Sequence, residues 1–74
     1  MKKFVGRVYG VQGQMVLVHC ESEYRPSLLE LLSAEELPSV QLEVHSYANR
    51  DLLYCLLLSS KEDISRNMRI VTEG

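Results

Sequence analysis

The residues of this chain that could do chemistry are few and scattered. The strongest candidates are His19, Cys20, His45 and Cys55. Neighbouring residues on a strand point to opposite faces, so His19 and Cys20 are not expected to share one metal ion, and zinc sites usually have paired ligands at short spacing. A nucleophile could be built from Cys20 or Ser59 with His45, but nothing in the local sequence activates either group. We therefore predict no catalytic site and no metal site.

The glycines do not form a phosphate-binding loop. None of Gly6, Gly10, Gly13 and Gly74 stands in a glycine-rich loop that ends in Lys-Ser or Lys-Thr before a helix. We therefore predict no cofactor. The isolated chain is expected neither to bind nor to hydrolyse ATP, because it offers no arranged acid, base or nucleophile.

Composition narrows the class of protein. The 74 residues are enough for one domain, spanning 1–74, and 46% of them are hydrophobic. Acidic residues outnumber basic ones by 10 to 8, which argues against a basic nucleic-acid groove. No apolar run approaches the roughly 20 residues that span a bilayer, so we expect no membrane insertion. The N-terminus has no signal-peptide pattern, which favours a cytoplasmic location.

Both cysteines stand inside apolar runs, and Cys20 shares the strand phase of Val16 and Val18. A disulfide is possible in principle. Small secreted scaffolds are usually richer in cysteine, so we predict that Cys20 and Cys55 are buried, reduced thiols.

The chain consists mostly of short segments with strand character. Strands are predicted at residues 3–11, 15–20, 40–47, 52–58 and 68–72. The first two form a hairpin around a tight turn at residues 12–14, and Gly6 and Gly10 are expected to mark bends or bulges. The apolar run 52–58 is expected to be a strand buried on both faces.

The secondary structure of one segment has two possible interpretations. Residues 27–32 could open a short helix, with Ser27 as its cap and Glu30 three residues later, or could form a strand. Residues 33–39 are predicted to be a loop. Short strands without a long helix leave exposed edges that closure would remove. The predicted fold is therefore all-β, a small closed six-stranded β-barrel with or without one short helical turn.

A series of short motifs, in this order, covers essentially the whole chain: Gly6-Arg7-Val8, Val11-Gln12-Gly13, Met15-Val16-Leu17-Val18, Pro26, the leucine-rich residues 28–32, Leu42-Glu43-Val44, Leu57-Leu58-Ser59-Ser60, Ile64-Ser65-Arg66-Asn67-Met68 and Val71-Thr72-Glu73-Gly74. Together they resemble the N-terminal β-barrel domain of rotary ATPase head subunits, most closely that of the F-type ATP synthase β subunit. The family usually has an acidic residue where Leu17 and Leu58 stand, and glycine where Asp63 and Asn67 stand. Asp and Asn tolerate a positive φ best among the other residues, so the turn can keep its geometry.

The resemblance implies a non-catalytic crown barrel that holds a hexameric head together. Its partners would be the neighbouring homologous head subunits, and the parent would belong to a proton- or sodium-translocating ATP synthase that is peripheral to the membrane. ATP chemistry would lie outside this chain, so the chain itself is not expected to be an enzyme. The alternatives are a free-standing barrel that binds a protein or peptide, then a nucleic-acid-binding barrel, and last an independent enzyme.

The resemblance also implies which side chains face outward. Comparison with the family places Cys55 and Leu57 inside the barrel. Tyr54, Leu56 and Leu58 then point out, and Leu17 is expected to join them. An outward apolar patch of this kind usually marks an interaction surface. The alternative is that the segment 28–32 folds over this face within the same chain.

Overall fold

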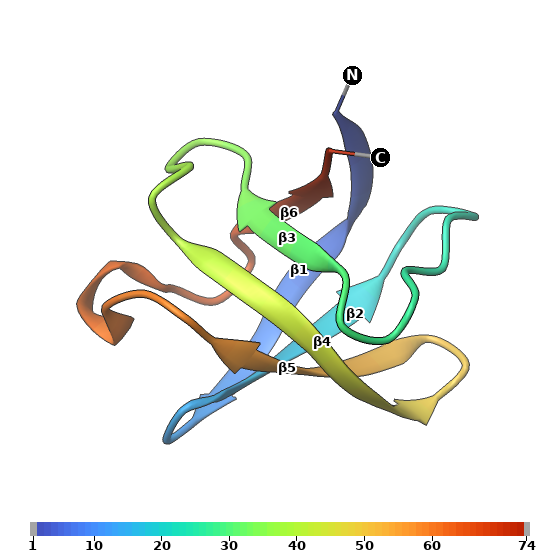
Figure 1. Ribbon diagram of the computed structural model, residues 1–74, viewed down its shortest axis with the longest axis horizontal. Coiled ribbons are helices and arrows are strands. Elements are labelled where there is room, and N and C mark those ends of the chain that lie inside the picture. The colour runs from blue at the N-terminus through green and yellow to red at the C-terminus, as the bar shows by residue number, and fades with distance from the viewer. Residues whose placement is uncertain (1, 74) are drawn as a thin grey trace.

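The computed structural model describes residues 2–73, which form a closed antiparallel β-barrel (Figure 1). Within these residues the elements are β1 (Lys3–Gln12), β2 (Met15–Cys20), β3 (Leu31–Ala34), β4 (Gln41–Asn49), β5 (Leu52–Leu57), the 3-10 turn η1 (Lys61–Asp63) and β6 (Arg69–Thr72). Around the barrel the strand order is β1–β2–β5–β4–β3–β6, and β6 closes onto β1. The prediction of an all-β, closed six-stranded barrel is confirmed.

The β1–β2 hairpin sets the curvature of the barrel. Gly13 takes a φ of 60° in its turn, a conformation that favours glycine. The strand register shifts beside Gly6 and beside Gly10, as predicted for bulges. A Cβ atom at Gly6 would collide with the carbonyl oxygen of His19, so the close approach of these two strands requires glycine there.

The core lies inside the barrel, and β2, β3, β4 and β5 contribute alternate residues to it. Fourteen buried side chains form one cluster within the described residues: Val5, Val8, Val16, Val18, Cys20, Leu32, Ala34, Val40, Leu42, Val44, Leu53, Cys55, Leu57 and Ile70. Each fully buried Val or Leu side chain contributes about 1.5–3 kcal/mol relative to exposure. The predicted inward positions of Cys20, Cys55 and Leu57 are confirmed, and both cysteines are free.

The segment before β4 departs from its predicted form. Residues 28–29 form a turn and β3 begins at Leu31, so the segment becomes a strand rather than a helix. Leu29 has a φ of 72°, which a right-handed helix does not allow. The predicted loop at 33–39 is wrong for its first two residues, because Ser33 and Ala34 pair with β6.

Two other expectations need correction. The strand β5 is not buried on both faces, since Leu56 is 36% exposed and Leu58, just beyond the strand, is 48% exposed. A closed barrel has one interior, so only alternate residues can enter it. In the loop before β6, Asn67 has the expected positive φ of 69°, whereas Asp63 lies in η1 without one.

The two ends of the described chain lie side by side at one end of the barrel (Figure 1), because Lys3 of β1 is the register partner of Thr72 of β6. Among residues 2–73 there is no helix with the length and hydrophobicity needed to cross a bilayer.

Candidate interaction face

The outward side chains of β3, β4, β5 and β2 form a continuous surface. Strand register aligns Leu31 with Glu43, Glu43 with Leu56, and Leu56 with Met15. Opposed residues of neighbouring strands hold their Cβ atoms about 4.5–5.5 Å apart, so side chains contact one another along such a row. We call the surface the outer face and define it by seven residues: Met15, Leu17, Leu31, Glu43, Tyr54, Leu56 and Leu58.

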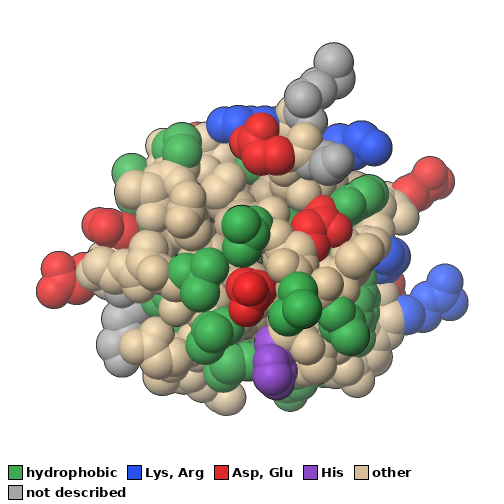
Figure 2. Space-filling view, in the orientation of Figure 1, with side chains coloured by type: hydrophobic (Ala, Val, Ile, Leu, Met, Phe, Trp, Pro, Cys, Tyr) green, Lys and Arg blue, Asp and Glu red, His purple; other side chains and the backbone are tan. Residues whose placement is uncertain are grey.

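Six of the seven outer-face residues are hydrophobic, and none is fully buried. Leu31 is 60% exposed, while Met15, Leu17 and Tyr54 are half-buried. Figure 2 shows hydrophobic side chains gathered around a single acidic side chain on the side of the barrel that turns β4 and β5 to the viewer. A contiguous apolar surface of this kind usually marks a site of interaction with another molecule.

The structure brings the predicted interface residues together. Leu17 of β2 is the register partner of Tyr54 of β5, and Leu56 and Leu58 continue the same outward alternation. The alternative, in which the segment 28–32 covers this face, is wrong. That segment lies beside the face: it contributes Leu31 to the sheet, and its other outward leucines are themselves exposed.

Sequence reasoning missed Met15, Leu31 and Glu43 as members of the face. Met15 has the same strand phase as Leu17, so the alternation could have identified it. Leu31 was not identified because residues 27–32 could be interpreted as either a short helix or a strand. The position of Glu43 among leucines depends on the register of three strands, which cannot be predicted from the sequence.

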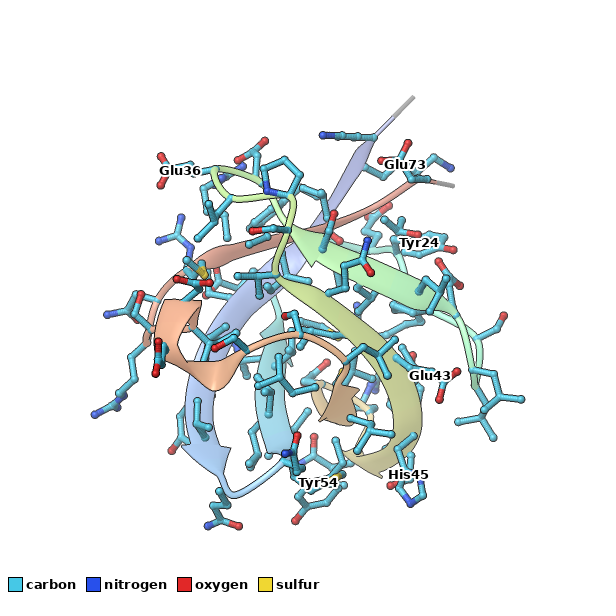
Figure 3. All side chains as sticks on the ribbon, turned by 60° about the vertical axis from the view of Figure 1, so that its left-hand side comes forward. Tyr24, Glu36, Glu43, His45, Tyr54 and Glu73 are labelled. Atoms are coloured by element: carbon cyan, nitrogen blue, oxygen red, sulfur yellow. The ribbon has the colours of Figure 1, made fainter. Side chains whose placement is uncertain are left out.

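Glu43 is the only charged residue of the outer face. It is half-buried between Leu31 and Leu56, and the structure of residues 2–73 records no hydrogen bond or ion pair to its carboxylate. Figure 3 shows Glu43 and His45 following one another along the outer side of β4. The carboxylate is therefore left to solvent or to a partner.

A second glutamate, Glu30, has very different surroundings. Its Oε2 atom accepts hydrogen bonds from the hydroxyl groups of Tyr24, at 2.6 Å, and Thr72, at 2.5 Å. Its Oε1 atom accepts from the backbone N–H of Ser27 at 2.9 Å. Partial burial alone would raise the pKa of Glu30, but these three hydrogen bonds outweigh it and hold the pKa below its ordinary value. We call these four residues the Glu30 cluster.

The Glu30 cluster joins two distant parts of the chain. Thr72 is 42 positions from Glu30 and its side chain is buried, so the carboxylate ties β6 to the segment before β3. The bond to Glu30 also raises the pKa of Tyr24. With its oxygens occupied by the protein's own donors, this carboxylate is suited to hold the fold together rather than to act as an acid or base.

The candidate nucleophiles are not activated. Burial raises the pKa of Cys55 to about 12, and burial also raises the pKa of Cys20. His19 and His45 lie on the exposed outside of the barrel, so neither accompanies a buried thiol. The hydroxyl oxygen of Ser59 accepts a hydrogen bond from the backbone N–H of Gln41 at 3.1 Å.

One shallow groove of about 250 Å³ lies next to the outer face. Its walls come from the β3–β4 region and the end of the described chain: Leu31, Leu32, Ser33, Pro38, Gln41 and Glu73. These residues include one acid, Glu73, and one hydroxyl group, Ser33, but no Lys, Arg or His. Among residues 2–73 there is no group of three metal-ligating side chains.

No protein-family model matches the chain, and no curated protein sequence shows significant similarity to it.

Proposed function

We propose that this chain is a non-catalytic assembly barrel, and that it serves as the crown barrel of a rotary ATPase head subunit. The observation that carries the proposal is the outer face, where six hydrophobic side chains remain at the surface of a domain whose core is already closed. Such a face is stabilised when another surface covers it. In a ring of barrels, each neighbour provides that surface.

Two further features support the proposal. The resemblance of the sequence to rotary ATPase barrels implies a six-stranded barrel, and the chain has that fold. The ends of the described chain meet at one end of the barrel, whereas the outer face lies on its side. A domain joined beyond Thr72 would therefore leave the outer face accessible to a neighbouring barrel.

The second candidate function, a free-standing barrel that binds an unrelated protein, would use the same outer face. A nucleic-acid partner fits this face poorly, because its only charge is the carboxylate of Glu43 and bound phosphates require Lys or Arg.

Self-association of the chain tests the assembly role. We expect the wild-type chain to associate weakly and reversibly as its concentration rises, because one small face supplies a contact at the low end of the interface range. Leu56→Lys should abolish this association and leave the fold intact, since the side chain is already 36% exposed. The measurements are static light scattering, with circular dichroism to confirm the fold.

Leu37→Lys is the matched control. Leu37 is 37% exposed but lies in the loop between β3 and β4, outside the outer face. This variant should associate as the wild type does. A wild-type chain that stays monomeric at millimolar concentration, or equal loss of association in both variants, would contradict the proposed role of the outer face.

A further inference from the structure

The charge at the centre of the outer face restricts what can cover it. Glu43 stands in the row between Leu31 and Leu56, so a molecule that covers these leucines also covers the carboxylate. A carboxylate removed from water is costly unless a cation or several hydrogen-bond donors meet it. The occupant must therefore present a basic side chain within an otherwise apolar contact.

The outer face of a second copy does not meet this requirement. In a two-fold contact each copy offers the same surface, so the counter-ion of Glu43 would have to come from the outer face itself. The seven outer-face residues include no Lys or Arg. Two copies joined face to face would thus bury two carboxylates without a cation.

Other surfaces of the chain do carry suitable cations. Three arginines, Arg7, Arg25 and Arg69, already form ion pairs with Glu21, Asp51 and Glu35. By contrast, Arg50 and Arg66 are exposed, and neither forms an ion pair within the part of the chain that the structure describes. Both lie in connections between strands, at the β4–β5 turn and in the loop before β6.

We propose that the occupant of the outer face is a second copy of this chain in a head-to-tail contact, which places an exposed Arg or Lys of that copy against Glu43. The inference rests on the proposed assembly function and adds to it the direction of the contact and the charge of the facing surface. A head-to-tail contact uses two different surfaces of each copy, which is the arrangement that generates rings when the rotation closes.

Substitution at Glu43 tests the facing charge. We expect Glu43→Gln to weaken self-association of the full chain several-fold, and Glu43→Lys to abolish it, in sedimentation equilibrium at about pH 8, above the usual titration range of histidine. Added sodium chloride should weaken the wild-type association. The matched control is Glu36→Gln, which removes the same charge from an exposed loop well away from Glu43 (Figure 3). Association of Glu43→Gln that equals or exceeds that of the wild type would overturn the inference.

A mixing experiment tests the direction of the contact. Leu56→Lys changes the outer face but leaves the other surfaces of the variant unchanged. In a head-to-tail contact, these other surfaces can still cover the outer face of a wild-type copy. Fluorescently labelled Leu56→Lys should therefore co-sediment with excess wild-type chain, although it does not associate with itself. Failure to co-sediment would indicate a face-to-face contact and would overturn the head-to-tail arrangement.

The two proposals fail in different ways. If Leu56→Lys associates as strongly as the wild type, the outer face is not used and the assembly function is contradicted. If Leu56→Lys is monomeric but Glu43→Gln associates more tightly, the outer face is used without a facing cation, and only the present inference is overturned.

Discussion

Two glutamates on neighbouring segments of this barrel have opposite surroundings. The backbone carbonyl of Glu30 accepts a hydrogen bond from the N–H of Val44, so Glu30 and Glu43 lie on adjacent segments of the chain. The carboxylate of Glu30 accepts three hydrogen bonds from its own protein, one of them from a buried hydroxyl. The carboxylate of Glu43 lies among leucines and accepts none within residues 2–73.

This difference separates a carboxylate that stabilises the fold from one that is available to a partner. Removing the Glu30 carboxylate would take away an acceptor that Tyr24, Ser27 and Thr72 share, and the loss of a hydrogen-bond partner is costly for buried groups. Removing the Glu43 carboxylate would leave no donor unsatisfied. The free energy of unfolding should therefore respond strongly to changes at Glu30 and weakly to changes at Glu43.

The largest effect is expected from Glu30→Ala. This variant should lose about 2–3 kcal/mol of unfolding free energy, because the buried Thr72 hydroxyl and two further donors lose a charged acceptor. Urea denaturation followed by circular dichroism measures the loss. Tyr24→Phe removes one of the three hydrogen bonds and should cost about 1 kcal/mol. A smaller loss for Glu30→Ala than for Tyr24→Phe would contradict the role of the cluster.

The same carboxylate should make stability depend on pH. Its three hydrogen bonds outweigh partial burial, so the pKa of Glu30 in the folded chain lies below its ordinary value of 4.5. The unfolded chain then takes up the proton first as the pH falls, and the contribution of Glu30, complete above 4.5, is lost as the pH drops through the lowered folded pKa. Urea denaturation across this range should show a shallower decline in Glu30→Gln than in the wild type. Parallel declines in the two proteins would contradict the prediction.

The contrast between the two glutamates also shows which structural features could be predicted from the sequence and which could not. The alternation of Val40, Leu42 and Val44 against Glu43 predicted the inner and outer sides of β4 correctly, because a strand next to one core has a period of two. Closure into a barrel followed from the many short strands. The apolar neighbours of Glu43 come from β3 and β5, so only the register between strands, which is set by tertiary structure, places them there.

The Glu30 cluster was predictable only in part. The spacing of Ser27 and Glu30 suggested a helix cap, and the predicted pair does form a side-chain to backbone hydrogen bond. No helix follows, because Leu29 takes a positive φ and the chain enters β3. The partner Thr72 lies 42 residues away, and no local pattern connects it to Glu30.

A smaller, stabilising effect is expected from Leu29→Gly. Leu29 holds a left-handed conformation at φ 72° just before Glu30, which costs roughly 1–2 kcal/mol for a residue with a Cβ atom. Glycine removes that strain but loses more backbone entropy, by roughly 0.5–1 kcal/mol, so the net gain should be about 0.5 kcal/mol. Leu28→Gly is the control, since Leu28 is similarly exposed and has no positive φ. Urea denaturation should show Leu28→Gly to be destabilised, and equal effects of the two variants would contradict the assignment of strain to Leu29.

The smallest effect is expected from Glu43→Gln, and it gives the sharpest test of the comparison. In dilute, monomeric protein this substitution should change the unfolding free energy by no more than about 0.5 kcal/mol, as for surface positions without a specific partner. A slight gain is the expected direction, because the amide is less costly than a carboxylate to hold half-buried between Leu31 and Leu56.

Glu30→Gln makes the same chemical change and should lose about 1–2 kcal/mol, since an amide is a weaker acceptor for the three donors and its nitrogen accepts no hydrogen bond. Urea denaturation of both variants under identical conditions gives the difference directly. Equal losses would mean that Glu43 has a stabilising partner within its own chain, and the carboxylate would then not be free to receive a cation from a neighbouring barrel.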